Sequence, residues 1–185
     1  MPAVLPVEDA EVSKALERAL TKQGIKILTG TKTSRAETTK KGVQFILERK
    51  DQETIEAEVA LIAIGVLPLL PKGKLKLELT DRGYLQTDER YQTSAKGIYA
   101  AGDIIGPPWL AHVASWEAIQ AVEGMFAGIE PRKVREFPGC TYCQPQVASI
   151  GLTEKGAQES GRKFRIGKFP FSASGKISKR NLSAR

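Results

Sequence analysis

The segment 98–128 limits the possible folds of this chain more than any other part of the sequence. Residues 98–101, Ile-Tyr-Ala-Ala, predict a short buried strand that ends at Gly102 and Asp103. A loop rich in glycine and proline follows, and residues 110–128 predict a long helix. A strand, a tight turn and a helix in this order are typical of an α/β layer.

The turn at Gly102 and Asp103 has the chemistry of a ligand site. A carboxylate at the carboxyl end of a strand can accept hydrogen bonds from the hydroxyls of a sugar or a ribityl chain. The helix after it presents unpaired backbone N–H groups and about half a positive charge at its N-terminus. Such an end stabilises a group that becomes anionic, such as a phosphate or a reduced ring. These residues predict a ligand crevice without naming the ligand.

The segments before this turn predict a helix and several strands. One apolar helical face precedes Gly24, which closes that helix, and residues 25–28 alternate as a strand. Extended segments at 31–37, 42–50 and 54–58 predict a small antiparallel meander. The apolar face of its middle segment comprises Val43, Phe45 and Leu47, and the hairpin connection comprises Asp51 and Gln52.

Residues 59–64 are apolar without alternation, which predicts a fully buried parallel strand. Gly65 ends this strand and allows close approach of a ligand or of a neighbouring backbone. A glycine that only turns the chain is an equally good interpretation of these residues.

The later elements divide at a linker between Pro131 and Pro138. After it, residues 147–150 and 163–169 predict strands, and residues 153–160 predict a helix with Thr153 as its N-cap. The apolar positions of the long helix before the linker include Val113, Ala114, Ile119, Val122 and Phe126.

Composition and charge argue against several functional classes. The net charge is +7, but the lysines and arginines are spread along the chain and aromatic residues make up only 6%. Solvated surface lysines therefore explain the charge better than a nucleic-acid interface. The longest apolar run, 59–70, is short and contains Gly65 and Pro68, which argues against a membrane span. The first residues do not resemble a signal peptide, so we expect a cytoplasmic protein.

The two cysteines, Cys140 and Cys143, have the spacing of a redox or half-zinc motif. A structural zinc site needs four ligands, and this sequence has one histidine and no second cysteine pair. On a strand, side chains three residues apart point to opposite faces, which separates the thiols. We interpret both as buried or half-buried strand cysteines, and a redox role stays open as the less favoured interpretation.

Residues 93–103 match the element Thr-x-x-x-x-x-Tyr-Ala-x-Gly-Asp, and by it the chain resembles the pyridine nucleotide-disulfide oxidoreductases. Residues 110–112, Leu-Ala-His, narrow the resemblance to the dihydrolipoamide dehydrogenases of that family. The resemblance reaches to about Lys176, and further agreement lies at 5–20, 147–154 and 167–172.

The resemblance implies roles for seven residues. Asp103 would bind the ribityl chain of FAD, and the flavin ring would be lined, mainly by backbone, by Trp109, Leu110, Ala111 and His112. On the NAD side, Gly65 corresponds to a glycine that contacts NAD, and Thr33 to a position near the adenine. The family follows this glycine with Arg-x-Pro, whereas Val66-Leu67-Pro68 keeps only the proline. The family's catalytic base belongs to a later His-x-His-Pro segment, so we predict no catalytic residue and no metal ligand in this chain.

The resemblance also implies a fold and a function. We expect an α/β fold: part of a three-layer FAD/NAD(P)-binding fold over residues 1–130, with a parallel sheet, an antiparallel meander and helices. The start of an α+β dimerisation domain would follow over residues 131–185. The implied reaction is reoxidation of dihydrolipoamide to lipoamide with NAD+ through an active-site disulfide and FAD. The implied partners are a second copy in a homodimer and the lipoyl carrier domain of a 2-oxo acid dehydrogenase or glycine cleavage complex, with neither nucleic acid nor membrane.

The sequence contains no Gly-x-Gly-x-x-Gly loop and no cysteine pair with the family's four-residue spacing. We therefore expect an internal fragment that begins after the NAD phosphate loop and stops early in the interface domain. The alternatives are a relative of mercuric or glutathione reductase, an inert truncated product, and a basic domain with an interaction role. We expect the isolated chain to turn over no dihydrolipoamide, to retain FAD poorly and to aggregate.

Overall fold

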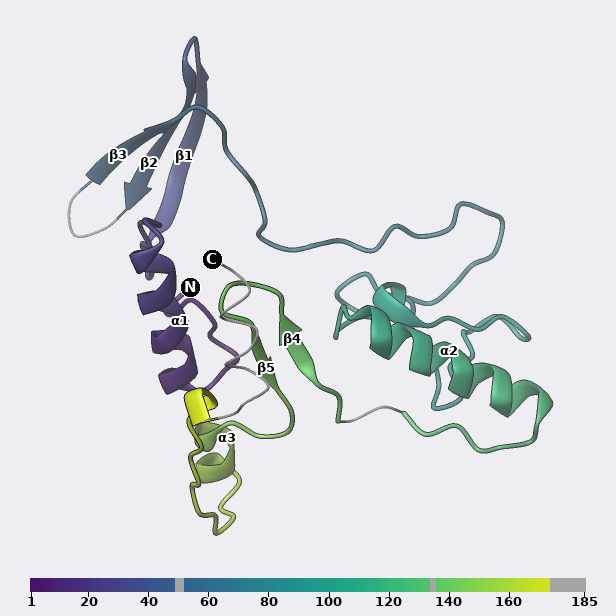
Figure 1. The fold of residues 1–185 in the computed structure, drawn as a ribbon. Helices are drawn as coiled ribbons and strands as arrows, with labels where there is room; N and C mark the ends of the chain where they lie inside the picture. Colours follow the sequence, from purple (N-terminus) through teal and green to yellow (C-terminus); the bar gives the residue numbers. More distant parts are fainter. Residues whose placement is uncertain (49–51, 134–135, 174–185) are drawn as a thin grey trace. The chain divides into compact units, whose positions relative to one another are not determined.

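The computed structural model describes residues 1–48, 52–133 and 136–173. It forms two compact units, Met1–Gly151 and Leu152–Arg185, whose helices and strands are labelled in Figure 1. The expected mixture of helices and strands is confirmed, but the sheets of the described residues are small and antiparallel. The expected parallel sheet is not seen in this part of the chain. The predicted connection at Asp51 and the tail after Lys176 lie outside the described residues.

Helix α1 comprises Ala10–Lys22 and confirms the first predicted helix. Its buried side chains are Ser13 and Leu16, and the Ser13 hydroxyl accepts a hydrogen bond from the Leu5 N–H at 3.2 Å. Gly24, two residues after the end of the helix, has the left-handed conformation, with φ +89°. The N–H of Gly24 donates to Thr21 O and the next N–H to Leu20 O, so the last carbonyls are satisfied as in a Schellman motif.

Three antiparallel strands form the predicted meander: β1 (Lys32–Thr39), β2 (Gly42–Glu48) and β3 (Gln52–Ala57). Their order in the sheet is β1-β2-β3. Leu47 is the buried residue of β2, and Phe45 pairs with Ile55 across the sheet. Of the predicted apolar face, only Leu47 is buried, whereas Val43 and Phe45 are half-buried like the residues between them.

The prediction of a buried parallel strand at 59–64 is wrong. This segment forms no strand, and Leu61 and Ile64 are 90% and 94% exposed. A central parallel strand needs neighbours on both sides to take its backbone hydrogen bonds, and no described segment pairs with this one. For the same reason, residues 25–28 and 163–169 form no strand.

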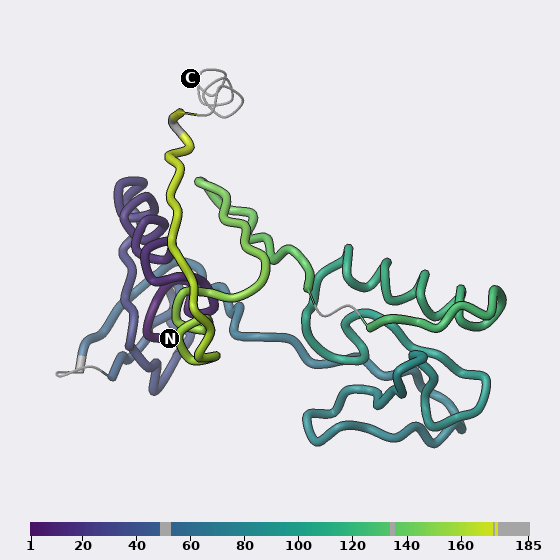
Figure 2. Tube along the Cα trace, turned by 90° about the horizontal axis from the view of Figure 1, so that it is seen from below, coloured from purple at the N-terminus to yellow at the C-terminus, as the bar shows by residue number. Residues whose placement is uncertain are grey.

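A second packed region contains α2, the helix Ala111–Phe126, which confirms the predicted long helix. The chain from residue 78 to residue 110 lies against one side of this helix in both Figure 1 and Figure 2. That segment contains the short 3₁₀ helix η1, Gly102–Ile105, which packs on α2. The buried side chains of this region include Tyr84, Leu85, Tyr91, Thr93, Val113, Gln120 and Ala121.

The predicted apolar positions of α2 are only partly buried. Val113 is buried, but Ile119, Val122 and Phe126 are exposed. The helix is apolar on most of its circumference, and such a sequence does not specify which side is covered. The covered side is the one that the turn at Gly102 contacts.

A short hairpin and a third helix follow the linker. Strand β4 (Gly139–Thr141) pairs antiparallel with β5 (Val147–Ser149), which confirms a strand near residues 147–150. In the second unit, α3 (Glu154–Glu159) begins at Thr153, whose hydroxyl accepts from the Gly156 N–H at 3.1 Å as predicted for an N-cap. The 3₁₀ helix η2, Phe171–Ala173, ends the described part.

The two cysteines differ in their surroundings. Cys140 lies on β4, whereas Cys143 lies in the turn after it, so the prediction of two strand cysteines holds only for Cys140. Both are half-buried free thiols. The Cys143 Sγ donates to Pro145 O at 3.0 Å.

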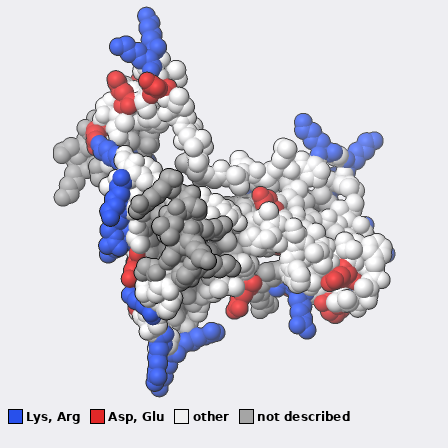
Figure 3. Space-filling model, viewed as in Figure 1, with Lys and Arg blue, Asp and Glu red and all other residues white. Residues whose placement is uncertain are grey.

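Figure 3 shows the Lys and Arg side chains at several separate places on one face, without a single basic patch there. None of the helices in the described part of the chain has the length and apolar character needed to cross a bilayer.

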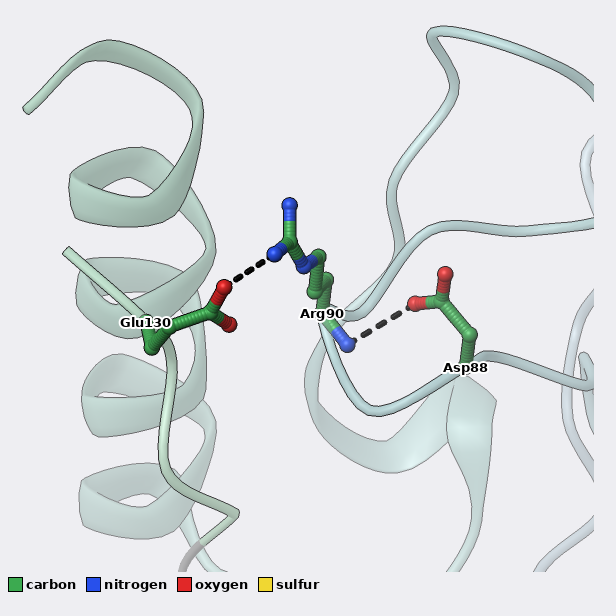
Figure 4. A network of polar contacts seen from close by, with 3 residues as sticks. All are labelled: Asp88, Arg90 and Glu130. Atoms are coloured by element: carbon green, nitrogen blue, oxygen red, sulfur yellow. Dashed lines mark hydrogen bonds and ion pairs between the residues drawn. The ribbon is translucent and has the colours of Figure 1, made fainter. Parts of the chain in front are cut away.

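The turn at residues 88–92 is held in two ways, which Figure 4 shows. The Asp88 carboxylate accepts from the N–H groups of Arg90 and Gln92 at 2.8 and 2.9 Å. The Arg90 guanidinium pairs with Glu130, which follows α2. Both side chains of this ion pair are mostly exposed.

We expect Asp88→Ala to lower the free energy of unfolding by about 1–2 kcal/mol, because two backbone donors lose a charged acceptor. Arg90→Ala should cost less than about 1 kcal/mol, because an exposed ion pair is weak, and about 1 M salt should remove even that loss. Urea unfolding of both variants checks this. A larger loss for Arg90→Ala than for Asp88→Ala would contradict it.

Candidate functional site

The segment 93–103 forms a tight turn that returns the chain to the region around α2. The Thr93 N–H donates to Ile98 O at 2.8 Å, and the Thr93 hydroxyl donates to the same oxygen at 2.9 Å. The Ala100 N–H donates to Tyr91 O at 3.0 Å, and Tyr91 is 1% exposed. In place of the predicted strand 98–101, the structure has only an isolated bridge within this segment. The threonine of the sequence motif therefore closes the turn that leads to Gly102.

Two hydrogen bonds attach η1 to its neighbours. The Gly102 N–H donates to the Glu117 carboxylate on α2 at 2.8 Å. The Leu85 N–H donates to Ile104 O at 2.9 Å. The turn is thus held on one side by a helix side chain and on the other by a neighbouring backbone.

Gly102 also packs against α2 in a way that only glycine allows. Its φ is +78°, in the left-handed region, and a Cβ at this position would lie 2.8 Å from the Ala114 Cβ. Contacts this short are not found between real Cβ atoms. Because glycine has no Cβ, the turn can approach the helix this closely at Gly102.

Asp103 takes part in this arrangement through its backbone and leaves its carboxylate exposed. Its carbonyl oxygen accepts from the Gly106 N–H at 3.2 Å. Within the described part of the chain, no hydrogen bond or ion pair engages the carboxylate. The hydrogen bonds of the turn do not involve this side chain, so the carboxylate remains available to a ligand.

A pocket of about 280 Å³ lies beside Asp103. It is lined by Val66, Leu67, Pro68, Leu69, Tyr84, Asp103 and Ile104. The pocket brings the segment directly after Gly65 next to Asp103, as expected if both contribute to one crevice.

The N-terminus of α2 has the character of an anion site. Leu110 stands at the N-cap position and no side chain caps the helix there. The N–H groups of Val113 and Ala114 both donate to Leu110 O, so the N–H groups of Ala111 and His112 precede the first intrahelical bonds. The positive end of the helix dipole is therefore not neutralised by a capping residue.

His112 and Trp109 flank this helix end. The His112 Nε2 lies 2.9 Å from Pro138 O, so a proton on Nε2 makes this a hydrogen bond. Trp109 is 45% exposed, and its ring centroid lies 6.4 Å from that of Tyr84. Tyr84 in turn packs against Gly106. The turn is thus bordered by aromatic rings and by the helix start.

The two predicted NAD residues lie on other elements. Gly65 has φ +138° and a Cβ there would meet nothing within 4 Å, so its backbone is open to close approach. Thr33 lies exposed on β1 opposite Leu47, next to an irregularity in the strand register. Among the described residues, no hydrogen bond joins Thr33 to Gly65 or to Asp103, and Thr33 does not line the pocket beside Asp103.

Two residues of this region were not predicted from the sequence. Glu117 lies within the predicted helix 110–128, three residues after Ala114 and therefore on the same helix face, but the sequence does not indicate its partner. Nothing in the sequence indicates that the ring of Tyr84 lies near that of Trp109.

Comparison with protein families gives two matches. A family described as pyridine nucleotide-disulphide oxidoreductase matches residues 1–118. The dimerisation domain of the same family matches residues 137–181. The second match extends past Lys176, where we expected the resemblance to end.

Two curated relatives share 41% and 44% identity with this chain, each over 184 residues and 95% of its length. They are the dihydrolipoyl dehydrogenases of Rhizobium etli and Chlorobaculum parvum. The chain spans only 38% and 39% of the length of these relatives. A solved structure, the HOCl-induced flavoprotein disulfide reductase of Escherichia coli, has a TM-score of 0.84 at 22% identity, over 98% of this chain and 42% of that one. This structural similarity supports the assignment of the fold.

Proposed function

The chain belongs to the pyridine nucleotide-disulphide oxidoreductase family, and from this premise we propose that it forms the flavin-contacting turn and part of the NAD site of a dihydrolipoyl dehydrogenase. One observation carries the proposal: the turn at Gly102 is fixed by hydrogen bonds to the Glu117 side chain and to the Leu85 backbone, while the Asp103 carboxylate stays exposed. The identity of 41% to a dihydrolipoyl dehydrogenase supports this branch of the family over glutathione or mercuric reductases.

The residues of the site fit FAD. The exposed Asp103 carboxylate can accept hydrogen bonds from the hydroxyls of a ribityl chain. The uncapped start of α2 can stabilise negative charge on the pyrimidine edge of a flavin ring. Trp109, Leu110, Ala111 and His112 would line that edge, mainly through backbone. When bound, FAD would carry an electron pair between a dithiol and NAD+.

The contribution of this chain to the reaction is to bind and orient. Asp103 would fix the ribityl chain, and the N–H groups of Ala111 and His112 would favour the anionic form of the ring edge. Gly65 would let NAD approach the backbone closely, and Thr33 would lie near the adenine. The cysteines of this sequence do not have the four-residue spacing of the family's redox pair. The dithiol chemistry would therefore require residues outside these 185.

The proposed partners follow from the same assignment. The dimerisation-domain match at residues 137–181 supports a homodimer. The substrate would be a dihydrolipoyl group on the carrier domain of a 2-oxo acid dehydrogenase or glycine cleavage complex. We place the division between the cofactor-binding region and the dimerisation domain near residue 130.

A hybrid enzyme tests the proposed function. Residues 1–173 of this chain replace the aligned residues of the Rhizobium etli dihydrolipoyl dehydrogenase, so that the rest of the protein comes from the relative. In a matched hybrid, the same residues replace the aligned part of a glutathione reductase. We expect dihydrolipoamide oxidation with NAD+ by the first hybrid and no glutathione disulfide reduction by the second.

A smaller graft serves as a control for loss of folding in the larger hybrid. It carries only residues 78–133, the region around α2. Turnover by either dihydrolipoyl dehydrogenase hybrid supports the proposal. Turnover by the glutathione reductase hybrid alone, or folded dimeric hybrids with no turnover at all, would overturn it.

A further inference from the structure

Glu117 connects the candidate flavin turn to the middle of α2. It lies one turn after Ala114 on the helix and is half-buried. Its Oε2 accepts from the Gly102 N–H at 2.8 Å, over a separation of 15 residues. It does not line the pocket beside Asp103, so it does not belong to the ligand-contacting residues described above.

The N–H of Gly102 has a particular need for this acceptor. Gly102 is buried, and a buried N–H without a partner is costly. Among the hydrogen bonds of the described residues, the Glu117 carboxylate is the acceptor for this N–H. An acceptor with a full negative charge makes a shorter and stronger bond than a carbonyl would.

The direction of the Asp103 side chain depends on the backbone of Gly102. Gly102 has φ +78°, and glycine at such a φ can rotate to many other conformations when nothing holds it. The close approach to Ala114 limits how near the turn comes to the helix, but it supplies no directional bond. The hydrogen bond from the Gly102 N–H to Glu117 is directional, and it therefore fixes the orientation of the Gly102 backbone.

We propose that Glu117 is a positioning residue for flavin binding: it fixes Gly102 on α2 and thereby aims the Asp103 carboxylate at the ribityl chain. This inference rests on the proposed function. Glu117 itself contacts neither cofactor nor substrate and acts only through the turn.

The test compares FAD affinity among variants of the dihydrolipoyl dehydrogenase hybrid, followed by the fluorescence of released FAD. Glu117→Ala should weaken FAD binding about tenfold, because one charge-assisted bond that orders the turn is lost. Glu117→Gln should restore most of the affinity, because its amide oxygen can still accept from Gly102. The matched control is Glu123→Ala, on the same helix, whose carboxylate accepts from Gln120 and does not contact the turn. It should bind FAD as the unmodified hybrid does.

A second comparison separates positioning from general loss of stability. In a hybrid that already carries Asp103→Ala, adding Glu117→Ala should cause no further loss of FAD affinity, although it should still lower the urea unfolding midpoint. In the full 185-residue chain, Glu117→Ala should speed amide hydrogen exchange at Gly102.

The possible results distinguish the positioning role of Glu117 from the proposed function. If Asp103→Ala weakens FAD binding and Glu117→Ala does not, the positioning role is overturned and the proposed function stands. An equal further loss from Glu117→Ala in the Asp103→Ala hybrid also overturns it. If Asp103→Ala leaves FAD binding unchanged, the proposed function and this inference both fail.

Discussion

Replacing Gly102 with alanine is expected to lower the free energy of unfolding by about 2–4 kcal/mol. Part of this loss, roughly 1–2 kcal/mol, comes from placing a side chain at a left-handed φ of +78°. The rest comes from the new methyl group, which would lie 2.8 Å from the Ala114 Cβ. Both tryptophans, Trp109 and Trp116, lie beside or on α2, so their fluorescence in urea reports on this region.

Gly97 provides a matched control for the glycine at 102. Its φ is +79°, but a Cβ there would meet nothing within 4 Å. Gly97→Ala should therefore cost only the backbone part, roughly 1–2 kcal/mol. Ala114→Gly should recover part of the extra loss in the Gly102→Ala variant, because it removes the methyl group that clashes. Equal losses for Gly97→Ala and Gly102→Ala would show that the close contact with α2 does not stabilise the turn.

Asp103→Ala in the dihydrolipoyl dehydrogenase hybrid is expected to weaken FAD binding by about 10–100-fold. The loss of a charge-assisted hydrogen bond to the ribityl chain amounts to about 1.5–3 kcal/mol, and each 1.4 kcal/mol changes affinity about tenfold. Folding should change little, because the carboxylate makes no contact that supports the turn among the described residues. FAD dissociation constants and urea midpoints of the same variants measure the two effects separately.

Asp81 gives the control for the aspartate at 103. It is also exposed, and it lies in a turn rather than beside the pocket at Asp103. Asp81→Ala should leave FAD affinity unchanged. Asp103→Asn should bind FAD better than Asp103→Ala, because the amide oxygen still accepts hydrogen bonds. Similar FAD affinity in the Asp81 and Asp103 variants would remove Asp103 from the site.

Features that depend on short stretches of sequence were predictable. The apolar face and terminal glycine of α1, the alternating strand β2 and the N-cap at Thr153 all act through neighbours within a few residues. The turn within 93–103 was predictable for the same reason, while its role as a ligand site stays a prediction. Its threonine closes the turn and its glycine permits the contact with α2.

Features that depend on distant partners were not predictable. The run 59–64 has the composition of a buried parallel strand, but a strand forms only where other strands accept its hydrogen bonds. The buried side of α2 was only partly predicted, because the helix is apolar on most of its circumference and the contact at Gly102 decides which side is covered. Glu117 was missed because its partner is a backbone N–H 15 residues away.

The most direct test of the central claim is the FAD content of the purified hybrid that carries residues 78–133 of this chain, measured as the ratio of flavin absorbance to polypeptide after gel filtration. We predict about one FAD per polypeptide in the hybrid and in its Asp81→Ala variant, and a clear loss of FAD in its Asp103→Ala variant. A folded hybrid dimer that holds no FAD, or one in which Asp103→Ala retains as much FAD as the unmodified hybrid, would contradict the assignment of this turn to a flavin site.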